Sequence, residues 1–156
     1  MPLVFNNEAN EFTQESQVVI GVLDCIERTG SPEAADAAKD IITQSHSIAE
    51  QIVASEDVEQ IINLVNQYQT FWETAIDDIQ LNDDVNGRMM LQVVMSIMIA
   101  LLWFKVGNVQ GSVDNFSYAY QYSEQLSMFD LVDLINGEAG NLLPKDWREP
   151  EENDEA

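Results

Sequence analysis

The sequence predicts an all-α protein, a compact bundle of about five long helices plus one short helix, built from antiparallel helical hairpins. Between residues 13 and 137, apolar residues recur every three or four positions, which is the period of a helix with one buried face. No window alternates convincingly with the period of two that a strand requires. With 156 residues, 46% of them hydrophobic, the chain is long enough to bury one sizeable core without disulfides.

The domain organisation follows from where this periodicity begins and ends. Residues 1–12 form an N-terminal arm, residues 13–137 a helical domain, and residues 138–156 an acidic C-terminal tail. We expect the tail to be disordered because it ends in a run of carboxylates, although Leu142, Leu143 and Trp147 could dock just before that run.

The first helix is predicted over residues 13–29, with Gly30 ending it. Its buried positions are Val18, Val22, Cys25 and Ile26. A second helix follows at once, because Ser31, Pro32 and Glu33 supply an N-cap, a proline at the first helical position and an early carboxylate.

The second and third helices each carry one continuous apolar or small-residue stripe. In the second, the stripe is Ala34, Ala38, Ile41, Ser45, Ile48 and Ile52. In the third, over residues 57–80, it is Val58, Ile61, Val65, Tyr68, Trp72, Ala75 and Ile79. Only a few residues around Ser55 separate the stripes, so the two helices should form an antiparallel hairpin. The same stripes could instead join two copies of the chain in a homodimer.

The fourth helix, over residues 85–106, is apolar almost all round and is predicted to be the central, buried helix. A transmembrane span is the alternative, but the sixteen residues between Arg88 and Lys105 include Gln92 and Ser96 and fall short of the roughly 20 apolar residues that a bilayer requires. Another alternative is an adaptable groove lined by methionines. These are Met89, Met90, Met95 and Met98.

Gly107 and Asn108 mark the next break, and a fifth helix carries apolar and small residues at helical spacing. These are Val113, Phe116, Ala119, Tyr120 and Ser123. Ser127, with Asp130 three residues later, resembles a capping box and predicts the start of a short sixth helix, which Gly137 closes.

The formal net charge is −22, from 28 acidic and 6 basic residues, and it favours basic protein partners. Charge of this sign repels phosphate backbones and anionic membranes, so we expect neither direct nucleic-acid binding nor a membrane contact. The single cysteine, Cys25, forms no intrachain disulfide, and the N-terminus lacks the pattern of a secretory signal. These features predict a cytoplasmic protein.

Five carboxylates flank the turn between the third and fourth helices and form the candidate partner-binding site. They are Glu73, Asp77, Asp78, Asp83 and Asp84. Such a cluster suits an arginine-rich or lysine-rich surface, although an ordinary solvated turn would look the same.

No constellation predicts a metal, a cofactor or a catalytic site. Asn82, Asp84, Asn86 and Gly87 follow the spacing of an EF-hand loop, but Val93 stands at the twelfth position, where the closing glutamate is needed. His46 and Glu50 alone do not make a metal site, and no nucleophile elbow or glycine-rich loop is present. We therefore expect a protein that is not an enzyme.

Two functions are consistent with these features. The first is an acidic interaction module that binds and inhibits a basic partner such as a nuclease, as immunity proteins, antidefence proteins and DNA mimics do. The alternative is a helical chaperone or scaffold that binds an amphipathic segment of a partner protein. Acidity that adapts the chain to a high-salt habitat is a third possibility.

Overall fold

The computed structural model describes residues 14–79 and 85–143, and all regular secondary structure within them is α-helical. The helices are α1 (Gln14–Thr29), α2 (Pro32–Ala54), α3 (Val58–Asp78), α4 (Val85–Lys105), α5 (Val109–Gln125) and α6 (Phe129–Leu142). This confirms the predicted all-α bundle. The predicted arm, residues 1–12, and the last part of the tail, residues 144–156, lie outside the described residues.

The N-terminal signals predicted for α2 are present. The Ser31 backbone is extended, and its side-chain oxygen accepts a hydrogen bond from the Ala34 amide at 3.1 Å, with Pro32 as the first helical residue. The helix α3 begins in a similar way, because the Asp57 carboxylate accepts from the Glu59 amide at 3.3 Å. Satisfying these free amides fixes where both helices start.

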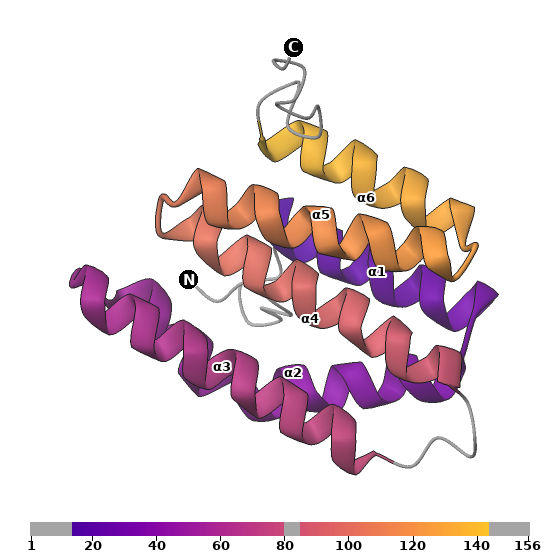
Figure 1. Cartoon of the computed structure of the whole chain (residues 1–156), viewed down its shortest axis with the longest axis horizontal. Helices are drawn as coiled ribbons and strands as arrows, with labels where there is room; N and C mark the ends of the chain where they lie inside the picture. Colours follow the sequence, from indigo (N-terminus) through magenta and orange to yellow (C-terminus); the bar gives the residue numbers. More distant parts are fainter. Residues whose placement is uncertain (1–13, 80–84, 144–156) are drawn as a thin grey trace.

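The helix α4 is the centre of the bundle. It contacts α1, α2, α3 and α5, while α6 contacts α5 and α1. Every residue from 93 to 102 is buried, including the small polar side chain of Ser96. In Figure 1, α4 runs between the α2–α3 pair on one side and α5 and α6 on the other.

The expectation that this helix is too short for a membrane span is wrong. Asn86–Lys105 spans 20 residues and is long and apolar enough to cross a bilayer by length and composition. However, 72% of its most apolar window is buried inside the structure. Packing on all sides therefore accounts for its composition, as in the core helix of a bundle.

The turn after α4 is a Schellman motif centred on Gly107. The Gly107 amide donates to the Phe104 carbonyl at 3.1 Å, and the Asn108 amide donates to the Trp103 carbonyl at 2.8 Å. Gly107 has a φ of +88°, a left-handed conformation that suits glycine. Asn108 then caps α5 by accepting from the Gly111 amide at 2.9 Å, so α4 and α5 form a tight hairpin.

Ser127 does not cap α6 as predicted. It adopts a φ of +58° and ends α5, with its amide donating to the Glu124 carbonyl while the Met128 amide donates to the Ser123 carbonyl. This is a second Schellman motif, occupied by serine where glycine is usual. Met128 is the N-cap of α6 and makes no side-chain capping bond.

The predicted end of the sixth helix at Gly137 is also wrong. The helix α6 continues through Gly137 and Gly140 to Leu142, so residues 138–142 of the predicted tail are helical. Leu131 and Ile135 are fully buried, and Ala139 and Leu143 prolong this apolar stripe. Burial of the stripe outweighs the roughly 1 kcal/mol by which glycine disfavours a helix interior.

Most residues of the α2 and α3 stripes are buried between these helices and α4, but three are half-buried: Ile48, Ala75 and Ile79. Val58, which was predicted to be buried, is 70% exposed. Trp72 and Tyr68 are the largest buried side chains, and their ring centroids lie 6.5 Å apart. Within the described residues, neither the Tyr68 hydroxyl nor the Trp72 indole nitrogen has a hydrogen-bond partner. Burial, which disfavours the charged phenolate, raises the pKa of Tyr68 to about 12.

Replacing Gly111 by alanine should destabilise the α4–α5 hairpin. A Cβ there would lie 2.7 Å from Cγ of the Trp103 ring, which would have to shift. We expect Gly111→Ala to lower the free energy of unfolding by about 1–2 kcal/mol, measured by urea denaturation. Gly137→Ala is the matched control, because its Cβ meets nothing within 4 Å and should stabilise α6 by about 0.5–1 kcal/mol. Equal effects of the two substitutions would contradict the proposed contact.

Alkaline pH should destabilise the fold through Tyr68. Its pKa is raised from 10.0 to about 12, so its contribution is intact below pH 10 and is lost as pH rises towards 12. We expect a loss of roughly 2 kcal/mol across this interval. Over the same pH interval, the stability of the Tyr68→Phe variant should fall by roughly 2 kcal/mol less than that of the unmodified protein, as measured by parallel denaturation curves. Parallel losses in the two proteins would mean that other groups cause the effect.

Candidate functional site

The predicted acidic cluster is divided between two faces of α3. Glu73, Asp77 and Asp78 are all exposed on its last turns, while Asp83 and Asp84 lie outside the described residues. Asp78 lines a groove between α2 and α3, whereas Glu73 lines a cleft between α3 and α5. Glu73 and Asp78 therefore line different hollows, and the role of the cluster in partner binding stays a prediction.

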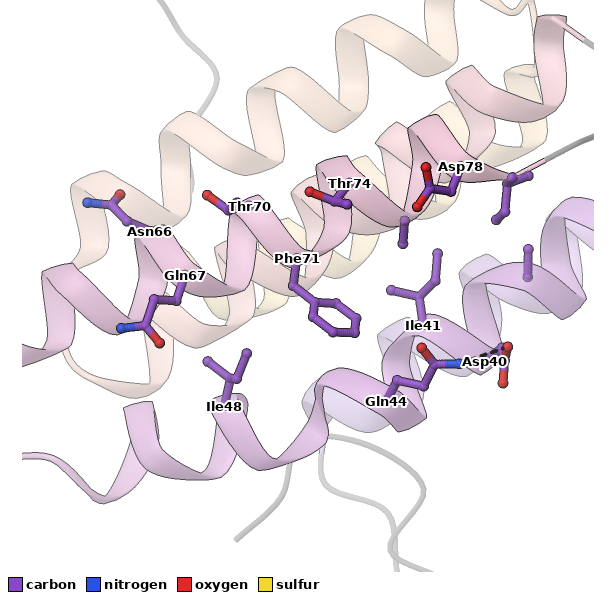
Figure 2. Close-up of a pocket in the computed structure, with 13 residues that line it drawn as sticks. Asp40, Ile41, Gln44, Ile48, Asn66, Gln67, Thr70, Phe71, Thr74 and Asp78 are labelled. Carbon is purple, nitrogen blue, oxygen red and sulfur yellow. Dashed lines mark hydrogen bonds between the residues drawn. The ribbon is translucent and has the colours of Figure 1, made fainter.

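The groove between α2 and α3 is the larger of these hollows, with a volume of about 890 Å³. Its floor consists of apolar side chains from both helices: Ala37, Ile41, Ile48, Phe71, Ala75 and Ile79. Figure 2 shows the Phe71 ring pointing from α3 towards α2, between Ile41 and Ile48. Phe71 and Ile48 are half-buried, so the groove exposes apolar surface that the bundle does not cover.

Polar side chains form the rim of the groove. They are Asp40, Gln44, Asn66, Gln67, Thr70, Thr74 and Asp78. The Gln44 amide nitrogen donates to the Asp40 carboxylate at 3.1 Å, which holds one wall in place. Amide and hydroxyl groups on the rim could bond to polar side chains at the margin of a docked segment.

Among the described residues, no lysine or arginine lines the groove. Two cations lie near the end that carries Asp40 and Asp78. The Lys39 ammonium is 3.9 Å from the Glu27 carboxylate, and Arg88 donates to the Ile79 carbonyl at 2.9 Å, at the end of α3. The groove lining itself therefore has negative charge only.

The groove exists because the apolar surface of the α2–α3 hairpin is wider than its contact with α4. On the inner side, Ser45, Tyr68 and Trp72 are buried in the core. Phe71 on α3 and Ile48 on α2 lie on a different face of each helix, the face that lines the groove. The helical period places Ile48 in the core stripe and does not single out Phe71. However, the apolar residues at positions 68, 71, 72, 75 and 76 indicate a face broader than a single seam.

The cleft between α3 and α5 is smaller, about 580 Å³, and has α4 as its floor. In the described chain α3 and α5 make no direct contact, so each contributes one wall. Glu73 accepts a hydrogen bond from Gln69 on one wall, and Asp114 accepts from Gln110 on the other. On the floor, Met95, Ile99 and Trp103 lie beside the polar Gln92 and Ser96, and most of the other lining residues carry amide or phenol groups. The lining of the cleft is therefore more polar than that of the groove.

Among the described residues, no group of three or more histidine, cysteine, aspartate or glutamate side chains is arranged to hold a metal ion. The imidazole of His46 lies 3.2 Å from the Glu50 carboxylate, as expected for residues one turn apart. Of the residues with EF-hand spacing, Asn82 and Asp84 lie outside the described residues, whereas Asn86 and Gly87 belong to the first turn of α4. Cys25 is a buried free thiol in α1.

Comparison with protein-family models, with curated proteins and with solved structures found no match to this chain. The groove, the cleft and the charge around them are therefore the features that bear on function. Of the two hollows, the groove is the larger and has the more apolar lining, with carboxylates on its rim.

Proposed function

We propose that this chain is a protein-interaction module, without enzymatic activity, that binds a basic amphipathic helix of a partner protein in the α2–α3 groove. The observation that carries the proposal is the apolar floor around Phe71, bordered by Asp40 and Asp78 and by no cation. Of the two functions expected from the sequence, this geometry favours the chaperone or scaffold. The partner segment is still expected to be basic, as in the inhibitor hypothesis.

In the proposed contact, the apolar floor and the acidic rim have different roles. Burial of the exposed parts of Ile48 and Phe71 would provide affinity, since each square ångström of apolar surface removed from water contributes about 25 cal/mol. The carboxylates Asp40 and Asp78 would select cationic partners and speed association. A helix laid in a groove between two others is a common form of peptide recognition.

Inhibition of a nuclease or another nucleic-acid-binding protein remains a second candidate. The net charge of −22 favours it, together with the exposed carboxylates Glu73, Asp77 and Asp78 on the last turns of α3. Basic amphipathic helices often contact phosphates, so capture of one would exclude nucleic acid from the partner. Neutralising Asp77, Asp78, Asp83 and Asp84 together tests this binding face.

Removing the Phe71 ring should weaken peptide binding. The probe is a fluorescent amphipathic peptide with leucines at i, i+3, i+4 and i+7 and lysines on its other face, and its Kd is measured by anisotropy. We expect Phe71→Ala to raise Kd about tenfold, or about 1.4 kcal/mol. Phe129→Ala is the matched control, because Phe129 is 64% exposed on α6, away from the groove.

A second variant separates lost binding from lost folding. Thr74 is an exposed residue of the rim, so Thr74→Arg should obstruct the groove without touching the core. Circular dichroism should show native helicity and melting for this variant while peptide affinity falls. If Phe71→Ala and Thr74→Arg both bind like the unmodified protein, the groove is not the binding site.

The rim carboxylates should control how binding depends on salt. Asp40→Asn combined with Asp78→Asn should weaken binding of the lysine peptide several-fold at low ionic strength and flatten its salt dependence. The control is Asp114→Asn with Asp133→Asn, which removes the same charge outside the groove. It is matched because Asp114 accepts a hydrogen bond from Gln110, as Asp40 does from Gln44. An equal effect of the two double variants would show that only net charge matters.

A further inference from the structure

We infer that the bound helix is about 12 residues long and lies with its cationic residues at the Asp40–Asp78 end of the groove. This inference rests on the proposed function and adds the length, charge pattern and orientation of the partner segment. It follows from how the lining residues are distributed along α2 and α3.

The length follows from helix geometry. On α2 the lining runs from Ala37 to Ile48, and on α3 it runs from Asn66 to Ile79. At 1.5 Å per residue, these segments are about 17 and 20 Å long, which matches roughly 12 residues of a docked helix. Three turns of an amphipathic helix present apolar residues at i, i+3, i+4 and i+7, enough to cover the floor.

The orientation follows from the ends of the groove. Figure 2 shows Asp78 and Asp40 near one end, while Ile48, Asn66 and Gln67 lie at the other. The lining of this second end carries no charged side chain. A helix with cations confined to one end gains attraction in one orientation only, because the reverse orientation places its cations beside amides.

Charges just beyond the lining make the acidic end more negative. Asp36 shares a shallow hollow with Asp40, and Asp77 precedes Asp78 in the last turn of α3. The two cations nearby, Lys39 and Arg88, do not cancel these four carboxylates, and Lys39 lies close to Glu27. The acidic end therefore keeps a net negative charge.

The α2–α3 connection lies beyond the other end and also carries acids. Asp57 caps α3 by accepting from the Glu59 amide. Glu56 and Glu59 are exposed but line no part of the groove. A docked helix of about three turns would end before it reaches these carboxylates.

The test uses two amphipathic peptides of about 12 residues with one composition and one apolar stripe. One carries its lysines in the first turn, the other in the last. Each bears a nitroxide at its lysine end, and the broadening of isoleucine methyl signals in NMR spectra reports its position. With both peptides, the nitroxide should broaden Ile79 strongly and spare Ile48, so the two peptides bind in opposite directions along the groove.

Other outcomes overturn the inference in different ways. If both peptides bind but lie in the same chain direction, backbone geometry and not charge sets the orientation, and the inference fails while the proposed function stands. Broadening of both isoleucines to the same extent would mean no preferred orientation. If neither peptide binds in calorimetry, the proposed function fails and the inference falls with it.

Two variants separate orientation from affinity. Asp40→Asn with Asp78→Asn should keep measurable binding but broaden Ile48 and Ile79 alike, whereas the control pair Asp114→Asn with Asp133→Asn should keep the original pattern. A series of peptides of increasing length should gain affinity up to about 12 residues and little beyond. Continued gain with longer peptides would contradict the inferred length.

Discussion

Burial of α4 on every side is the constraint on which the rest of this structure depends. A helix that is apolar all round must be covered all round, and here α1, α2, α3 and α5 share that task. Because α2 and α3 cover one side and α5 covers another, α3 and α5 do not meet in the described chain, and a cleft remains between them. Among the described helices, α3 contacts only α2 and α4, and the groove runs along α2 and α3 where no other described helix lines it.

The turns show why some boundaries could be predicted and others could not. Ser31 and Gly107 act through intrinsic preferences, side-chain capping and a left-handed backbone, so residue type alone indicates their roles. Ser127 has the right type for an N-cap and the right spacing to Asp130, yet it ends the preceding helix with a positive φ. The choice between the two roles depends on how α5 and α6 pack, which a local pattern does not contain.

The residues of the candidate site were also only partly predictable from local patterns. Period and composition predicted the helices and a core around Trp72 and Phe116, because burial of one face leaves a repeating signal. They did not separate an apolar residue in the core from one in an open groove, since Ile41 and Ile48 have the same spacing and chemistry but different burial. Nor could they show that Glu73 and Asp78, five residues apart, line different hollows of the bundle.

Charge distinguishes the proposed occupant of the groove from a second copy of this chain. A two-fold dimer presents the same surface from both partners, so each charged group needs a complement within that surface. The groove lining offers Asp40 and Asp78 and no cation, and each copy brings a net charge of −22. In self-association through the groove, electrostatic repulsion would therefore oppose the gain from apolar burial. A cationic helix gains from apolar burial and from charge attraction. The apolar floor and the acidic rim thus favour the same kind of partner, which neither feature defines alone.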